Sequence, residues 1–287
     1  MKINNFFYYP AASISKIIIY RLKNLIEIKL KIIKQFFLYY KLIKKVKKLK
    51  NTKKNQKAFV FANGPSLNIL SPDKINKINY DIFVVNKFIN QKEYSSIEPN
   101  FYVLSDPGYF DHTNEDHEIV KKISSKNKLL FCPFYFISKK EFSNSNIYGF
   151  CDIEDHLDSN VQDITKPRGY LSATAYKALS IAIYLGYSEI FICGIDNNQI
   201  LQSASDSQNN LFYKSTHFYK EKQNDKDSII DIKKYWPSLG YMMYTEHFLF
   251  NDLEKFSKLK KTKIINLDKE SLNISFSKDH NLDIYKE

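Results

Sequence analysis

Between residues 57 and 267 the sequence alternates short apolar runs with longer helical segments, and this alternation limits the fold more than any other feature. The runs lie at 58–62, 81–86, 101–105, 129–133, 189–193 and 263–267, and each has the length of a buried strand. Residues 174–185, rich in Ala and Ile, and residues 245–259 have the length and pattern of helices. Strands that alternate with helices predict an α/β fold whose sheet is mostly parallel and covered by helices on both faces.

The first 56 residues differ in composition from the rest of the chain. They hold 15 Lys or Arg residues and one acid, a net charge of +14, whereas residues 57–287 hold −2 of the total of +12. Apolar residues recur at gaps of three or four from Ile18 to Val46, which predicts a long basic amphipathic helix, with a polar linker after it. Such a helix suits an anionic membrane interface, although packing on the domain or on a partner helix would use the same pattern. We therefore expect a helical segment over 1–56 and one domain over 57–287.

Charge and motif content exclude several classes of protein. Because the basic charge lies outside the domain, the sequence argues against a nucleic-acid-binding fold. Three scattered cysteines and unpaired histidines give no disulfide framework and no zinc site. There is no Walker-type motif, no GxGxxG and no Asp-x-Asp, which disfavours kinases, dinucleotide enzymes and a metal held on a sugar diphosphate. With no signal peptide and no run of 18 apolar residues, we expect a cytoplasmic protein held peripherally on the inner face of the membrane.

Polar or small residues follow four of the predicted strands. They are Asn63-Gly64-Pro65-Ser66, Asn86, Asp106-Pro107-Gly108 and Gly194-Ile195-Asp196. In an open parallel sheet, ligands bind beyond the carboxyl ends of the strands. Gly64 would let the backbone approach a ligand closely, and Ser66 would cap the next helix and offer N–H groups to a phosphate. We expect a nucleotide pocket here, with a plain turn as the alternative for the first motif.

Two further side chains are candidates for chemistry. Arg168 lies shortly before the helix at 174–185, where a guanidinium could clamp a phosphate or a carboxylate. His217 lies in the polar, irregular segment 197–238, which we expect to be a lid, and a neutral imidazole there could act as a general base. For both residues, an ordinary place on the solvated surface is the alternative.

These residues, in this order, resemble the bacterial sialyltransferases of lipooligosaccharide synthesis, glycosyltransferase family 42. The resemblance spans roughly residues 57–275 and is carried by an ordered series of stretches rather than by one motif. The stretches are Phe61-Ala-Asn-Gly-Pro-Ser-Leu67, Val84-Val-Asn-Lys-Phe88, Asp106-Pro-Gly-Tyr-Phe110, Ala182-Ile-Tyr-Leu-Gly-Tyr-Ser-Glu-Ile190, Gly194-Ile-Asp196, Ser215-Thr-His-Phe-Tyr219 and Ile265-Asn-Leu-Asp-Lys-Glu-Ser-Leu272.

The resemblance implies a Rossmann-like, GT-A-type domain with a lid. Such an enzyme inverts the anomeric centre, takes its sugar from CMP-sialic acid, and needs no metal or other cofactor. It further implies that His217 takes the proton from the acceptor hydroxyl and that Arg168 lies near the phosphate or carboxylate of the donor. The donor-binding residues that it implies are Asn63, Gly64, Ser66, Asn86, Asp106, Gly194 and Asp196 at the strand ends, Ser172 or Thr174 at the start of the helix, and Tyr213.

Two departures from the family pattern leave the donor sugar open. Asp106 stands where the family has Asn, which brings a negative charge close to an anionic donor. Asn197 and the two residues after it stand where the family has tyrosines that hydrogen-bond the leaving phosphate, and Tyr213 is the nearest substitute. The donor can therefore be sialic acid or another ulosonic acid on CMP, and the acceptor a glycan of lipooligosaccharide or capsule. A pterin or nucleotide pyrophosphokinase-like enzyme and a non-enzymatic membrane-associated scaffold remain the alternatives, and a homo-oligomer is left open.

Overall fold

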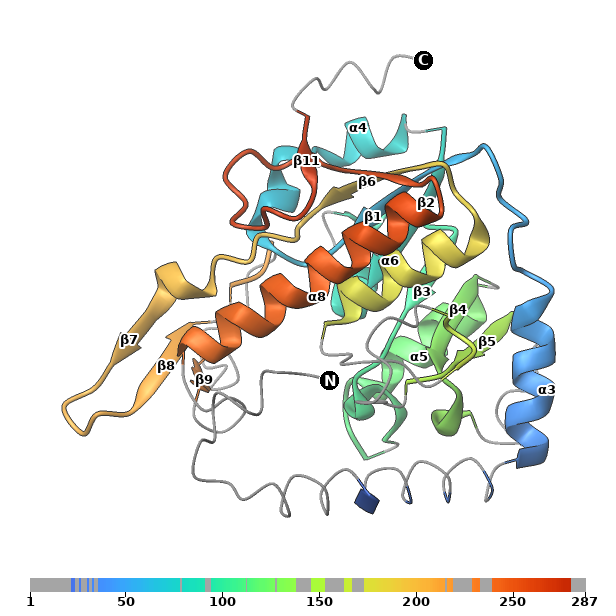
Figure 1. Ribbon diagram of the computed structural model, residues 1–287, viewed down its shortest axis with the longest axis horizontal. Helices are drawn as coiled ribbons and strands as arrows, with labels where there is room; N and C mark the ends of the chain where they lie inside the picture. Colours follow the sequence, from blue (N-terminus) through green and yellow to red (C-terminus); the bar gives the residue numbers. More distant parts are fainter. Residues whose placement is uncertain are drawn as a thin grey trace.

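In the computed structural model, the described residues form an α/β fold (Figure 1). They are 22–23, 26, 30, 33, 36–77, 79–90, 94–111, 113–126, 128–137, 146–152, 163–166, 173–214, 216–218, 229–232 and 239–279. None of the helices within these ranges is long and apolar enough to cross a membrane.

The centre of the fold is an eight-stranded sheet in which every pair of neighbouring strands is parallel. In spatial order its strands are β11 (Ser277–Lys278), β10 (Lys263–Asn266), β6 (Glu189–Cys193), β1 (Lys57–Phe61), β2 (Asp81–Val85), β3 (Phe101–Val103), β4 (Leu129–Pro133) and β5 (Ile147–Phe150). The predicted α/β class is therefore confirmed. Because β1 pairs with both β2 and β6, its carboxyl end meets two neighbouring strand ends.

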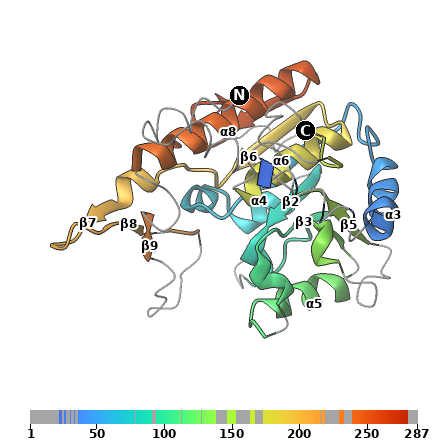
Figure 2. The ribbon, with the colours of Figure 1, turned by 60° about the horizontal axis from the view of Figure 1, so that its bottom comes forward.

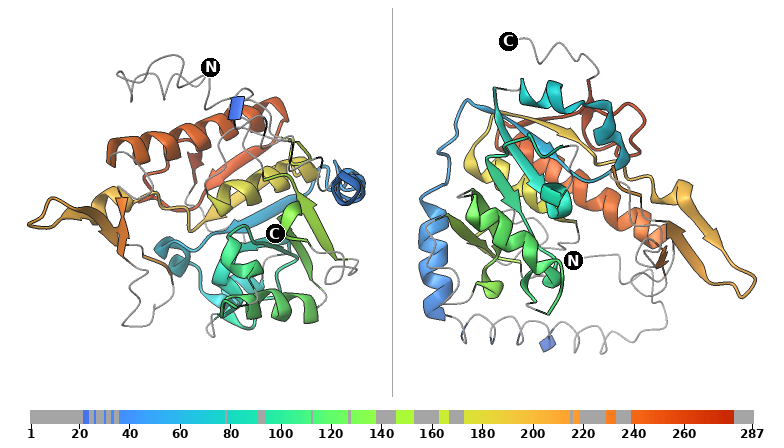
Figure 3. Two further views of the ribbon diagram at one scale, coloured as in Figure 1. Left: turned by 90° about the horizontal axis from the view of Figure 1, so that it is seen from below. Right: turned by 180° about the vertical axis from the view of Figure 1, so that it is seen from behind.

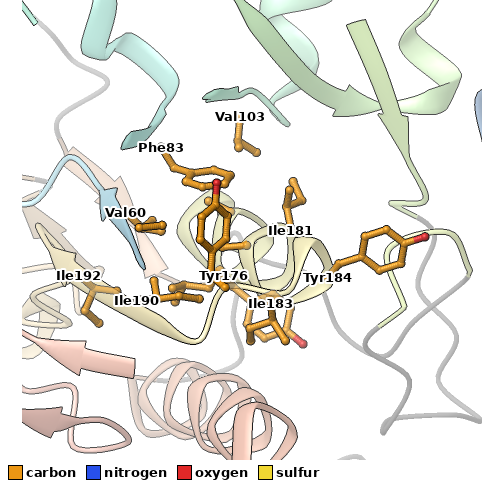
Figure 4. Close-up of a cluster of buried hydrophobic side chains, with 14 of the residues drawn as sticks. Val60, Phe83, Val103, Tyr176, Ile181, Ile183, Tyr184, Ile190 and Ile192 are labelled. Atoms are coloured by element: carbon orange, nitrogen blue, oxygen red, sulfur yellow. The ribbon is translucent and has the colours of Figure 1, made fainter. Parts of the chain in front are cut away.

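Helices cover both faces of this sheet (Figure 3). On one face, Val60 and Phe83 pack with α6 (Thr174–Leu185), whose residues from Tyr176 onward are buried; several of these side chains are seen in Figure 4. The longer helix α8 (Leu239–Leu259) contributes Phe250 and Leu253 to the same core. The opposite face packs against α5 (His117–Ser125), α4 (Pro72–Asn76) and the 3-10 helix η1 (Pro65–Ile69). Side chains that alternate along each strand thus serve two separate cores.

The edge strand β5 is covered by α3 (Phe36–Lys47), the last part of the predicted N-terminal helix (Figure 1). Ile43 and Val46 are buried, with exposed fractions of 8% and 0%, and Val46 belongs to the core that includes α6. Lys45 Nζ donates a 2.6 Å hydrogen bond to the Ile147 carbonyl of β5 and lies 4.3 Å from the centre of the Tyr148 ring. A helix and a lysine that cover an edge strand discourage its pairing with another chain. The structure therefore shows that α3, the last part of the predicted helix, packs on the domain.

The residues after α3, expected to be a polar linker, pack on the carboxyl end of α6. The Asn51 amide donates to the Tyr184 carbonyl at 3.1 Å, and the Lys53 amide donates to the Leu185 carbonyl at 2.9 Å. Both carbonyls belong to the last turn of α6, whose C=O groups have no partner within the helix. Gly186 ends the helix in the left-handed region, at φ +96°, where a glycine carries no Cβ penalty. The folded body therefore includes α3 and these turns as well as the residues from 57 onward.

The segment expected to be irregular contains a three-stranded antiparallel sheet, here called the arm. Its strands are β7 (Ser203–Ser205), β8 (Leu211–Lys214) and β9 (Ile229–Asp231), and it projects from the body at the end opposite α3 (Figures 1 and 2). One face of the arm packs on the first turns of α8, in a small core made by Tyr213, Ile232 and Met242. These strands are short, and β7 consists of small and polar residues, so the sequence lacked the apolar run that marks the other strands.

Candidate functional site

A cavity of about 190 Å³ lies beyond the carboxyl ends of β1 and β6. Six of the sequence-predicted residues line it: Asn63, Gly64, Gly194, Asp196, Tyr213 and His217. The sequence placed these residues in three separate stretches, and the order of strands brings them together. Other lining residues were not singled out beforehand, among them Ala173 and Ala175 at the start of α6, Gln202 of the 3-10 helix η6 (Gln199–Gln202), Thr216, and Phe250 of α8.

The turns after β1 and β6 touch through two glycines. The Gly64 amide donates a 2.9 Å hydrogen bond to the Gly194 carbonyl. Gly194 has φ +81°, and a Cβ atom built there would lie 2.3 Å from the Ala62 carbonyl oxygen. A Cβ on Gly64 would lie 2.5 Å from an Asp196 carboxylate oxygen. The backbones can approach this closely only because neither residue has a side chain.

Replacing Gly194 with alanine should therefore destabilise the protein. The left-handed conformation alone costs an L-residue roughly 1–2 kcal/mol, and the collision with Ala62 adds to that cost. We expect a loss of at least about 2 kcal/mol in the free energy of unfolding, measured by urea denaturation. Gly108→Ala is the matched control, because its nearest contact is a side-chain atom of Asn114 at 3.1 Å. Equal urea midpoints for the two variants would contradict the role given to Gly194.

Ser66 and Asp196 form a clasp between the same two turns. The Ser66 hydroxyl donates to Asp196 Oδ1, its amide donates to Asp196 Oδ2 at 3.2 Å, and its oxygen accepts from the Gly194 amide at 2.9 Å. Burial raises the pKa of the Asp196 carboxyl; the hydrogen bonds from Ser66 oppose this change, while the neighbouring Asp268 reinforces it. The Ser66 N–H group, which we expected to face a phosphate, donates to Asp196 in this structure.

Asn63, which follows β1, lines the cavity and also contacts the segment that carries His217. It is only 8% exposed, and its side-chain oxygen has no hydrogen-bond partner among the described residues. Its backbone carbonyl accepts a 2.9 Å hydrogen bond from the Phe218 amide. A buried amide oxygen without a partner is costly in a folded protein, so it indicates a group that a ligand satisfies.

His217 lies next to Asn63, because the Phe218 amide donates to the Asn63 carbonyl and the His217 ring is also hydrogen-bonded to the Asn63 backbone. Burial lowers the pKa of the His217 imidazole, a hydrogen bond with the Asn63 backbone opposes the change, and the positive charge of Lys87 reinforces it. The next residue, Phe218, is buried against the rings of Phe88 and Tyr94, whose centres lie 5.7 and 5.0 Å from the centre of the Phe218 ring. The anchored Phe218 therefore fixes the position of His217, and burial favours the neutral form of its imidazole.

The amino end of α6 faces the same cavity. Ala173 is its N-cap residue, and no side chain of the described residues caps the helix there. The first N–H groups of a helix have no partner within it and carry partial positive charge, so they favour an anion. Thr174, predicted at this point, instead shares a 2.7 Å hydrogen bond with the hydroxyl of Ser105 at the end of β3. Ser172 and Thr174 are both good capping residue types, so nothing in the sequence indicated that Ala173 would be the N-cap.

The remaining predicted residues lie away from the cavity or outside the described residues. Asn86 has φ +52° at the end of β2, and its buried side-chain oxygen has no partner within the described part of the chain. Asp106 is exposed and accepts a 2.9 Å hydrogen bond from the Gly108 amide, so it caps the 3-10 helix η4 (Pro107–Phe110). Arg168 and Ser172 lie outside the described residues. Within the described ranges, no group of three or more His, Cys, Asp or Glu residues is arranged to hold a metal.

Comparison with known proteins gives a distant structural likeness. No protein-family model matches the chain, and no curated protein matches its sequence. The sialyltransferase CstII from Campylobacter jejuni, in complex with cytidine-5'-monophosphate, has a TM-score of 0.49 and 17% identity, over 80% of this chain and 86% of that chain. The monofunctional alpha-2,3-sialyltransferase Cst-I from the same organism has a TM-score of 0.46 and 18% identity, over 78% and 79%. Because both TM-scores are below 0.5, these likenesses carry no argument about what the chain binds.

Proposed function

We propose that this chain is an inverting, metal-independent glycosyltransferase that moves sialic acid or a related ulosonic acid from CMP to a glycan of lipooligosaccharide or capsule. The catalytic unit would comprise residues 57–287 together with α3, with the lid at 197–238, and would work at the cytoplasmic face of the membrane. The ordered sequence resemblance to glycosyltransferase family 42 motivates the choice of family.

One observation carries the proposal. Three features face one cavity, at the place where parallel sheets bind ligands: a buried histidine whose pKa is lowered, the Asn63 side-chain oxygen, and the start of α6. Among the described residues, that oxygen has no hydrogen-bond partner and no side chain caps that helix. Transfer from a nucleoside monophosphate sugar requires a base, a polar contact for the nucleotide, and positive potential for a phosphate or carboxylate. The three features could supply these groups.

In the proposed reaction, the acceptor hydroxyl attacks the anomeric carbon of the sugar while the bond to the CMP phosphate breaks. His217 takes the proton of the hydroxyl, and CMP leaves with the electron pair of the broken bond. The N–H groups at the start of α6 and the Tyr213 hydroxyl would stabilise negative charge on the carboxylate and on the departing phosphate. Arg168 and Ser172 would contribute to the same anion site.

A screen of nucleotides tests the proposal. CMP, but not UDP or GDP, should stabilise the protein against heat, by about 2.7 kcal/mol when present at 100 times its dissociation constant. Transfer from CMP-sialic acid or another CMP-ulosonic acid should continue in EDTA. Activity that requires magnesium would favour a pyrophosphokinase-like enzyme, and no binding of any nucleotide would favour a scaffold.

Replacing Asn63 with alanine should weaken CMP binding by roughly 0.5–1.5 kcal/mol, measured by calorimetry, because one hydrogen bond to the nucleotide is lost. Its side-chain oxygen has no partner among the described residues, so the free energy of unfolding should not fall. Asn266→Ala is the matched control. Asn266 is fully buried at the end of β10 and accepts a 3.1 Å hydrogen bond from the Asp268 amide. Its side-chain nitrogen also has no partner among the described residues, but Asn266 does not line the cavity, so its replacement should lower stability and spare CMP affinity. The assignment of Asn63 fails if its variant binds CMP as the wild type does.

A further inference from the structure

The N-terminal segment exposes an apolar face that differs from the one buried on the domain. The described residues Leu22, Ile26, Leu30 and Ile33 are helical, and their side chains are 53%, 57%, 49% and 67% exposed. At 100° per residue, gaps of four, four and three place them within an arc of about 80° on one side of a helix. We call these four residues the exposed stripe.

The apolar residues of α3 that pack on the domain do not belong to this stripe. Tyr39, Ile43 and Val46 contact the body, and Tyr39 donates a 2.7 Å hydrogen bond to the Thr165 carbonyl. The sequence pattern from Ile18 to Val46 therefore mixes two uses. The apolar side chains of its last part are buried against the domain. The large aliphatic side chains farther toward the amino end remain in water, which is costly unless another surface covers them.

The charge around the stripe indicates what covers it. Residues 1–56 carry +14, and the described Lys23, next to Leu22, is exposed. A second copy would bring another +14 to the same contact, and like charges at that density oppose association. An anionic bilayer complements both properties, because its headgroups attract lysines and its acyl chains receive the aliphatic side chains.

We propose that the exposed stripe docks on an anionic lipid surface, with the helix lying in the interface rather than crossing the bilayer. The stripe inserts between headgroups, and the surrounding lysines contact the phosphates. This inference does not depend on the reaction that the cavity performs, so it can stand or fail separately from the proposed function.

Flotation of the full-length protein with vesicles tests the proposal. Vesicles that contain phosphatidylglycerol should carry the protein upward at low salt, whereas pure phosphatidylcholine vesicles should not, and 0.5 M salt should release it. The triple variant Ile26→Gln, Leu30→Gln, Ile33→Gln should lower the bound fraction at least about tenfold, because it removes the apolar contact and keeps the lysines. Glutamine preserves helix propensity, and equal melting temperatures would show that the fold is unchanged.

The double variant Leu201→Gln, Leu259→Gln is the matched control. These leucines are 74% and 81% exposed on the body, so their loss should leave vesicle binding as in the wild type. The proposal is overturned if the wild type does not float with anionic vesicles, if the triple variant floats as well as the wild type, or if the control loses binding equally. A wild-type dimer that becomes monomeric in the triple variant, without vesicle binding, would assign the stripe to a second copy instead.

Discussion

Replacing His217 with alanine should lower the rate of sugar transfer by roughly 100- to 10,000-fold, the usual contribution of a positioned general base. CMP affinity should be nearly unchanged, because the imidazole acts on the acceptor hydroxyl and not on the nucleotide. Steady-state transfer assays and calorimetry with CMP measure the two quantities. Near-normal transfer by the variant would show that another group removes the proton.

The pH dependence of the wild type gives a second measurement of the same role. A histidine acts as a base only when it is neutral, so the rate should rise with pH and then level off. Burial of His217 lowers its pKa below the ordinary value of about 6.5, so the midpoint of the rise should lie below pH 6.5. The plateau should disappear in His217→Ala. A midpoint well above pH 7 would contradict the buried, neutral base.

His247→Ala is the internal control for both measurements. His247 lies on α8 with its side chain exposed, and it is not among the residues that line the cavity. Its replacement should leave both the rate and the pH profile as in the wild type. A comparable loss in both variants would point to a general effect of removing histidines rather than to catalysis.

Removal of residues 1–56 should lower the free energy of unfolding by about 3–6 kcal/mol, whereas removal of residues 1–35 should have little effect on it. The longer deletion takes away the buried side chains of Ile43 and Val46, each contributing roughly 1.5–3 kcal/mol, and uncovers the edge of β5. The shorter deletion keeps all described contacts of α3. Urea unfolding of the two truncated chains measures the difference.

The shorter truncation also separates two properties of the N-terminal segment. It should fold with the cavity beyond β1 and β6 intact and fail to float with anionic vesicles, because the exposed stripe is gone. If both truncated chains unfolded at the same urea concentration as the full chain, α3 would not contribute to the stability of the domain.

The sequence predicted the main elements because each depends on a local pattern. The helix Thr174–Leu185 and the strand Glu189–Cys193 were predicted with their observed bounds, since a dense apolar stretch ends in the glycine that caps the helix. The strand β5 was missed: it is four residues long, and Gly149 interrupts its apolar pattern. The partner of α3 could not be predicted either, because an amphipathic stripe does not say which surface will cover it.

The candidate site was predictable only in part, for a related reason. Parallel topology places the strand ends at one edge, so Asn63 and Gly194 were expected to lie near each other, as they do. Whether a polar group at that edge faces a ligand or another protein group depends on distances that the sequence does not contain. Ser66 donates to Asp196, and Asp106 accepts a hydrogen bond from its own turn. The start of α6, where no side chain of the described residues caps the helix, faces the cavity instead.

The arm has a consequence for how proteins of this architecture can diverge. Asn63, Gly64 and Gly194 are fixed by the large sheet, where no side chain can be added to the two glycines without collision. Tyr213 instead belongs to the arm, which has a small core of its own on α8. Mutations on the outer face of the arm, which carries Lys214, can therefore accumulate without disturbing the strand ends. Under the proposed function, selection could exchange one acceptor glycan for another through that outer face, while the strand ends and the inward-facing Tyr213 that serve the donor are kept.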